Sequence, residues 1–113
     1  MKRTYESQQT CPIARSLDVL GDRWTMLLMR DLHNGHCRFA DLLRSLDGIS
    51  PNLLSARLKR LEEEGIVTRR LYSVHPPRAE YVLTEPGQAF KPVLDQITAW
   101  GSRFRPVETN GVS

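Results

Sequence analysis

The sequence contains little cysteine and no long apolar run, and each of these absences narrows the class of protein. Its 113 residues include two cysteines, Cys11 and Cys37. Two are too few for a disulfide scaffold, which fits a reducing compartment. No apolar run approaches the roughly 20 residues that span a membrane, and no apolar signal-peptide segment follows Lys2 and Arg3. We therefore expect a cytoplasmic protein without a membrane partner.

Patterns typical of enzymes are also missing. The sequence shows no Ser-His-Asp order, no Gly-rich phosphate loop and no carboxylate pair in an apolar setting. His33, His36 and Cys37 lie close together in the segment HNGHC, but no fourth ligand is evident and the spacing matches no zinc motif. A solvated loop is the interpretation we favour there. The sequence thus predicts neither an enzyme nor a bound metal or cofactor.

What the chain does contain is enough apolar sequence for one modest core, together with a slight excess of positive charge. Hydrophobic residues make up 40% and charged residues 26%, as in a globular domain covering residues 1–113. The net charge of +3 favours anionic partners weakly. Basic residues spread over 57–78, whereas Glu62, Glu63 and Glu64 share one turn, so we expect a polarised surface.

Apolar periodicity and turn residues divide the chain into helices and one hairpin. Pro12 and the Ser50-Pro51 pair are helix starts, while Gly21 and Gly65 are helix ends. The second helix carries an apolar stripe of Trp24, Leu27, Leu28 and Leu32. After a polar arm (1–10), we expect helices at 12–20, 23–33, 39–46 and 51–64, strands at 66–74 and 79–84, and one long helix at 86–105.

A short helix, a turn and a second helix that begins with Ser-Pro form a helix-turn-helix arrangement over residues 38–64. The hairpin at 66–84 follows directly and makes it a winged one. The expected fold is therefore mainly α (α+β): a winged helix-turn-helix with a two-stranded β wing and a C-terminal dimerisation helix.

The second helix of this unit has one face suited to reading DNA. On a helical wheel Leu54, Leu58 and Leu61 point inward, and the opposite face is polar and short-chained near its N-terminal end. Asn pairs with adenine, Ser bonds either way and Ala contacts a thymine methyl, whereas Lys and Arg suit phosphates. The alternative is an ordinary solvated helix face. The arginines of the hairpin favour DNA. The candidate DNA-binding residues are Arg38, Ser50, Pro51, Asn52, Ser55, Ala56, Lys59, Arg60, Arg69, Arg70, His75 and Arg78.

Several short segments along residues 10–104 match one known pattern in order and spacing. They are Cys11-Pro12-Ile13, Leu17, Leu20, Gly21, Trp24, RFADL (38–42), IS (49–50), Leu54, Leu58, LEEEGIV (61–67), PR (77–78), EY (80–81), LT (83–84), Gly87 and WG (100–101). This set resembles the HxlR-type winged-helix transcriptional regulators, relatives of the MarR group. Asp22 departs from the family's usual glycine but is still able to cap the following helix. Pro51 replaces a polar residue that many relatives carry at a possible base contact.

The resemblance implies a homodimer that binds double-stranded DNA at a pseudo-palindromic operator. The final helix supports dimerisation independently, because it has more apolar surface than so small a domain should leave exposed. Part of that surface must belong to the intramolecular core. The candidate dimerisation residues are Phe90, Val93, Leu94, Ile97, Trp100 and Phe104.

Cys11 precedes the proline that opens the first helix, where free backbone N–H groups and the helix dipole favour a thiolate. Arg15, one turn on, adds positive charge. The resemblance implies that this thiol is the one used by members that sense oxidants or reactive electrophiles. A packed, unreactive cap is the alternative. Two further alternatives are a regulator that responds to a small ligand without thiol sensing, and a winged helix that binds only proteins.

Overall fold

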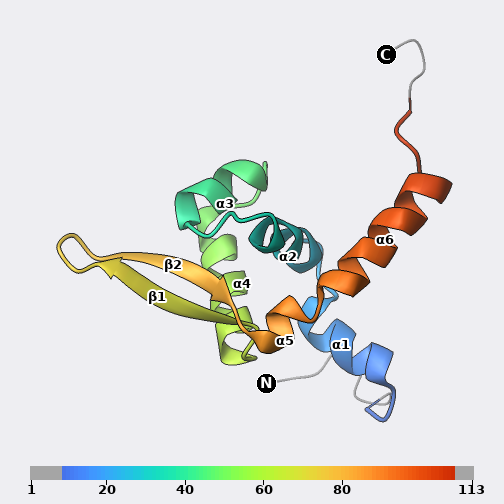
Figure 1. Cartoon of the computed structure of the whole chain (residues 1–113), viewed down its shortest axis with the longest axis horizontal. Coiled ribbons are helices and arrows are strands. Elements are labelled where there is room, and N and C mark those ends of the chain that lie inside the picture. The colour runs from blue at the N-terminus through green and yellow to red at the C-terminus, as the bar shows by residue number, and fades with distance from the viewer. Residues whose placement is uncertain (1–8, 109–113) are drawn as a thin grey trace.

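The computed structural model describes residues 9–108, and its elements follow the predicted order (Figure 1). Of the predicted N-terminal arm, all but Gln9 and Thr10 lies outside the described residues. The elements are α1 (Pro12–Leu20), α2 (Thr25–His33), α3 (Phe39–Ser45), α4 (Pro51–Glu63), β1 (Val67–Ser73), β2 (Arg78–Leu83), α5 (Glu85–Gln88) and α6 (Lys91–Phe104). The predicted winged helix-turn-helix fold is confirmed.

The predicted start and stop residues of α4 act as expected. The Ser50 hydroxyl accepts a hydrogen bond from the Leu53 amide at 3.1 Å, which satisfies one of the free N–H groups of the first turn. Pro51 occupies the first helical position, where its missing N–H costs nothing. Gly65 follows the helix with φ of 76°, a left-handed conformation that glycine adopts without strain. These local signals fix both ends of the second helix of the helix-turn-helix.

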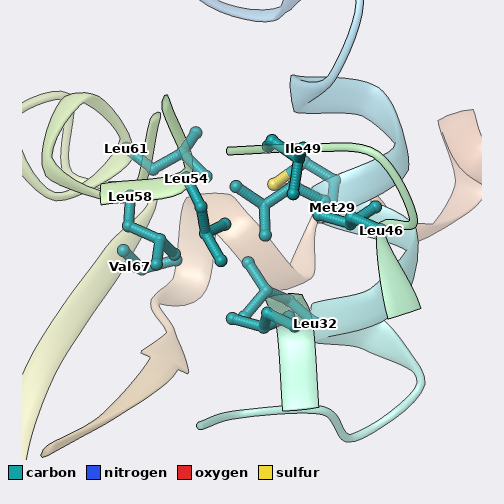
Figure 2. Close-up of a cluster of buried hydrophobic side chains, with 10 residues drawn as sticks. Met29, Leu32, Leu46, Ile49, Leu54, Leu58, Leu61 and Val67 are labelled. Atoms are coloured by element: carbon teal, nitrogen blue, oxygen red, sulfur yellow. The ribbon is translucent and has the colours of Figure 1, made fainter. Parts of the chain in front are cut away.

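The hydrophobic core lies between α2, α3, α4 and β1 (Figure 2). Leu54, Leu58 and Leu61 of α4 are fully buried, as the sequence predicted. They meet side chains of α2 and the segment after α3, and Val67 of β1 closes one side. Burying one such side chain contributes about 1.5–3 kcal/mol. The core therefore holds α4 firmly by one face and leaves its opposite face to solvent.

The apolar stripe of α2 differs from the predicted one by a rotation of the helix. Leu27 was predicted to face the core, but it is 39% exposed, whereas Met29 is fully buried. The helix begins at Thr25 rather than near Arg23, and the Asp22 side chain accepts hydrogen bonds from the Trp24 and Thr25 amides at its start. Asp22 therefore caps α2, as expected.

The wing is a two-stranded antiparallel sheet that projects from the helical body (Figure 1). Val67 pairs with Leu83 at its base and Arg70 with Glu80 near its middle, and the register shifts between Leu71 and Ser73. A third segment joins β2 on its other side. There the Tyr81 amide donates to the Cys37 carbonyl at 2.8 Å, which ties the loop before α3 to the wing.

The predicted long helix at 86–105 is in fact two helices, so that prediction was wrong in its extent. The first is the short α5, and α6 begins only at Lys91. Pro92 explains the break, since its ring lacks an N–H and would clash with the carbonyl four residues earlier in a continuous helix. Gly87 packs against the Ile66 carbonyl so closely that a Cβ would lie 2.3 Å from that oxygen. In residues 9–108 no helix has the length and apolar character needed to cross a bilayer.

Candidate nucleic-acid interface

The outer face of α4 carries the side chains that the sequence selected. Pro51, Asn52, Ser55, Ala56 and Lys59 are all exposed. Opposite them the buried leucines fix the roll of the helix, so this face cannot turn inward without emptying the core. The face is small and polar at the N-terminal end of α4 and becomes basic one turn later. This is the arrangement that a recognition helix presents to the major groove.

Two arginines of α4 do not belong to that face. Arg60 was predicted to contact phosphates, but its Nη2 donates to the Asp18 carbonyl of α1 at 3.0 Å, and its Nε pairs with Glu64 at 3.3 Å. Arg57 lies half-buried with its Nε 3.3 Å from Asp22 Oδ1. Both guanidinium groups therefore face the α1–α2 side of the molecule, on one flank of α4.

The wing carries several of the predicted DNA-binding residues on an exposed ribbon. Arg69, His75 and Arg78 are exposed, with His75 in the connection between β1 and β2. Arg70 differs from them, because its guanidinium forms a close ion pair with Glu80 of the facing strand. This hydrogen bond from Arg70 is the main cause that lowers the pKa of Glu80. Arg70 thus keeps its charge on the wing but shares it with a carboxylate.

A cleft of about 450 Å³ separates the wing from the start of α3, and arginines surround it. Arg38 lies directly before α3, with its guanidinium carbon 4.2 Å from the centroid of the Tyr72 ring. Arg44 and Arg78 also line the cleft, and Arg44 forms an ion pair with Asp41. The stacking holds the Arg38 charge at the mouth of the cleft, close to both helix-turn-helix and wing. Such a site suits the sugar–phosphate backbone.

Sequence reasoning missed Arg44, Tyr72 and Glu80 as members of this surface. The residues that meet here come from three separate segments, so only the pairing of β2 with the loop before α3 brings them together. The one available signal was the alternation within VTRRLYS, which places Arg70 and Tyr72 two residues apart on one strand.

Cys37 is held next to a carboxylate rather than next to a cation. Its thiol donates to Glu80 Oε2 at 3.7 Å. Burial raises the pKa of Cys37, and the charge of Glu80 and its hydrogen bond raise it further, against a smaller opposing effect of Arg38. The thiolate is therefore disfavoured at this position. Among the described residues no cluster of three His, Cys, Asp or Glu could hold a metal ion.

Cys11 sits in a different environment, at the N-cap of α1. Pro12 takes the first helical position as predicted, and the half-buried Cys11 side chain makes no capping hydrogen bond. Arg15, which the sequence placed near this thiol, donates to the Gln9 carbonyl at 3.1 Å. Two free thiols are therefore present, and the structure places them in separate segments on α1 and before α3.

One side of the molecule, here called the apolar flank, consists of Ile13 and Leu17 of α1 and of Val93, Ile97, Trp100 and Phe104 of α6. All six side chains are at least 36% exposed, and none of the residues of α6 is buried. A groove of about 250 Å³ lies between α1, α2 and the start of α6. Phe90 and Leu94, also predicted for dimerisation, instead pack partly against the core.

Helix α6 extends away from the body on the side opposite the wing (Figure 1). The radius of gyration, 15.9 Å, exceeds the roughly 13 Å expected for a compact chain of this length. An extended helix with an uncovered apolar face is typical of a subunit from an oligomer.

Comparisons with known proteins agree with this geometry. The HxlR-like helix-turn-helix family model matches residues 19–109. The HTH-type transcriptional regulator YybR of Bacillus subtilis is 36% identical over 106 residues, which cover 94% of this chain and 85% of YybR.

Solved structures superimpose on most of the chain. The transcription factor PA1607 gives a TM-score of 0.80 at 40% identity, covering 89% of this chain and 70% of PA1607. The redox regulator HypR in its reduced form gives 0.79 at 36% identity, covering 84% of this chain and 94% of HypR. Both solved structures therefore share the fold of this chain.

Proposed function

This chain belongs to the HxlR-like helix-turn-helix family of DNA-binding transcriptional regulators, and from that premise we propose how it binds DNA. Two copies form a homodimer on a pseudo-palindromic operator, and each places the N-terminal half of its α4 in the major groove of one half-site. The observation that carries this proposal is the outer face of α4, exposed and free of acidic residues before Glu62.

Base contacts come from the tip of α4. Asn52 and Ser55 supply hydrogen bonds and Ala56 an apolar surface for a thymine methyl. Ser50 and Pro51 lie at the entry of the helix, where the helix dipole favours a phosphate. The three glutamates at the far end repel DNA, so the helix enters tip first.

Backbone contacts come from Lys59 and from the arginines around the wing. Arg38, Arg44 and Arg78 surround the cleft beside Tyr72, which suits a stretch of backbone next to the major groove. Arg69 lies in the base half of the wing and His75 in the connection at its far end, and both are exposed for contacts with the adjoining DNA. Arg70 adds a charge that Glu80 partly neutralises. Arg60 makes no contact with DNA in this proposal, because its donors are directed at α1 and Glu64.

The apolar flank forms the dimer interface. Trp100 is 57% exposed and stacks on Phe104 with ring centroids 5.6 Å apart, which offers a large aromatic surface to a second copy. Trp and Phe are enriched in such interfaces. Sedimentation should give a dimer at micromolar concentration, and a stable monomer would contradict this part of the proposal.

A gel-shift titration against DNA from upstream of the protein's own gene tests the DNA contacts. Asn52→Ala should reduce the preference for operator over unrelated DNA, by about 1–3 kcal/mol for a lost bidentate base contact. Lys59→Met should weaken binding to all sequences alike and reduce the slope of log affinity against log salt by about 1. Equal losses of preference in both variants would contradict the assignment of base and phosphate contacts.

We further propose that Cys11 is the thiol through which oxidants or reactive electrophiles control DNA binding. The position of Cys11 supports this, since it is the N-cap of α1, and α1 contributes Ile13 and Leu17 to the apolar flank. A substituent on Sγ, or a disulfide formed by loss of two hydrogens to diamide from a pair of Cys11 thiols, would alter the dimer and with it the separation of the two α4 helices.

The matched variants for this second proposal are Cys11→Ser and Cys37→Ser. Diamide should change operator affinity of the wild type and of Cys37→Ser but not of Cys11→Ser. If all three proteins respond alike, Cys11 is a structural cap and the inducing signal is of another kind, such as a small ligand.

A further inference from the structure

Asp22, in the turn between α1 and α2, is held in place by several hydrogen bonds. Its Oδ1 accepts from the Trp24 amide at 2.9 Å and from the Thr25 amide at 3.0 Å. Its other carboxylate oxygen accepts a short hydrogen bond from the Thr25 hydroxyl, and Thr25 itself is buried. The carboxylate is therefore fixed relative to the first turn of α2.

The same carboxylate faces Arg57 of α4, with 3.3 Å between Asp22 Oδ1 and Arg57 Nε. That Nε is buried and makes no hydrogen bond to any of the described residues, so the charge of Asp22 is its compensation. Burial alone would raise the pKa of Asp22, but the hydrogen bonds from Thr25 and Trp24 and the charge of Arg57 together lower it. The carboxylate is thus ionised at neutral pH, and the contact is an ion pair.

A second contact joins α4 to the end of α1. Arg60 Nη2 donates to the Asp18 carbonyl in the last turn of α1 at 3.0 Å. Arg57 and Arg60, three residues apart, lie on one flank of α4 between the buried leucines and the outer face. Helix α4 is therefore fastened both to the last turn of α1 and to the α1–α2 turn.

We propose that Asp22, Arg57 and Arg60 are positioning residues, forming a brace that fixes the orientation of α4 to that of the α1–α2 turn. None of the three touches DNA in the proposed function, on which this inference rests. The core permits small tilts of α4, because apolar contacts are not directional, whereas the ion pair and the hydrogen bond hold the helix at two separate points. Since α1 also forms part of the apolar flank, a shift of α1 in the dimer would carry α4 with it. The brace therefore lets the dimer interface set the separation of the two α4 helices, and with it the half-site spacing that the protein binds best.

The test measures the selectivity for half-site spacing, a quantity that loss of stability alone does not change. Operator affinity is compared with affinity for the same operator carrying one inserted central base pair, and the ratio of the two is the readout. Asp22→Asn keeps an oxygen that caps α2 but removes the charge that faces Arg57. Glu85→Gln removes one negative charge from the exposed first turn of α5, outside the proposed DNA contacts and the apolar flank, and is the charge-matched control.

We expect the ratio to fall by a factor of roughly three to ten in Asp22→Asn and to keep its wild-type value in Glu85→Gln. Arg57→Gln combined with Asp22→Asn should give the ratio of Asp22→Asn alone, because both act on one contact. Arg60→Met removes the second contact of the brace, and its ratio replaces that of Asp22→Asn if Asp22→Asn does not fold. A wild-type ratio in both Asp22→Asn and Arg60→Met would overturn the proposal. A wild-type protein that binds operator and unrelated DNA equally would instead refute the proposed function, and this inference with it.

Discussion

Ser50 allows the structural and the DNA-binding roles of one residue to be separated with two substitutions. Its hydroxyl caps α4 by accepting from the Leu53 amide at 3.1 Å, and it is exposed at the end of the helix that we place against DNA. Ser50→Ala removes the cap. Ser50→Asp retains a capping oxygen, since Asp ranks with Ser at this position, but adds a negative charge where phosphates should lie.

The two variants should change different quantities: Ser50→Ala should lower thermal stability, and Ser50→Asp should lower DNA affinity. Loss of a cap costs about 1 kcal/mol, which corresponds to a fall in Tm of roughly 4 °C for a chain of this length. Ser50→Asp should leave Tm at or above the wild-type value, because its charge also interacts favourably with the helix dipole. Its affinity for operator should fall by at least about tenfold at low salt, since like charges in contact cost several kcal/mol.

Thermal unfolding and gel-shift titration over a range of salt concentrations distinguish these outcomes. The salt slope of Ser50→Asp should be smaller than that of the wild type by about 1, whereas Ser50→Ala should retain the wild-type slope. Wild-type DNA affinity in Ser50→Asp would refute the placement of the α4 tip at the DNA. A wild-type Tm in Ser50→Ala would refute the energetic role of the cap.

Three further predictions concern the core, the apolar flank and the second thiol. Leu58→Ala, at a fully buried position, should lower the free energy of unfolding by about 2–5 kcal/mol, measured by urea denaturation, and a loss under 1 kcal/mol would contradict the core assignment. Ile97→Asp should convert the dimer to a monomer in sedimentation while the far-UV circular dichroism is retained, and an intact dimer would show that α6 is not at the interface. Because the charge of Glu80 adds to the raised pKa of Cys37, Glu80→Gln should move the pH midpoint of Cys37 alkylation lower and speed alkylation at pH 8, as followed by mass spectrometry. An unchanged pH profile would mean that burial alone controls this thiol.

The sequence alone was sufficient to predict those helix boundaries that depend on local chemistry. Ser50, Pro51 and Gly65 mark the ends of α4, and their effects act within one turn, so they can be recognised without tertiary information. The leucine stripe of α4 was equally clear, because its spacing matches the helical period over two full turns. Both features held, and together they predicted the exposed face that the proposed function uses.

The features that could not be predicted depend on contacts between distant segments. Met29 rather than Leu27 lies in the core because of the rotation of α2 about its own axis when it packs against α4. Both side chains are hydrophobic, so hydrophobicity does not predict which of them is buried. Arg60 has the same local pattern as a phosphate-binding arginine, and only the position of the Asp18 carbonyl shows that its donors are engaged elsewhere. Arg70 and Glu80 are ten residues apart in sequence, so their pairing required the register of the wing.

The position of α1 suggests how a change at the apolar flank can alter the orientation of α4. Its apolar side chains belong to the flank opposite the wing, while its last turn holds Arg60 of the helix that we place in the major groove. No separate ligand domain is needed for a change at the flank to reach α4, because one nine-residue helix contacts both. A thiol at the first turn of that helix is well placed to act as a trigger, whereas Cys37, hydrogen-bonded to a carboxylate beside the wing, is not. In the proposed coupling α1 moves as a rigid unit, so a glycine introduced at the buried Ala14 should weaken the response to diamide more than it weakens DNA binding itself.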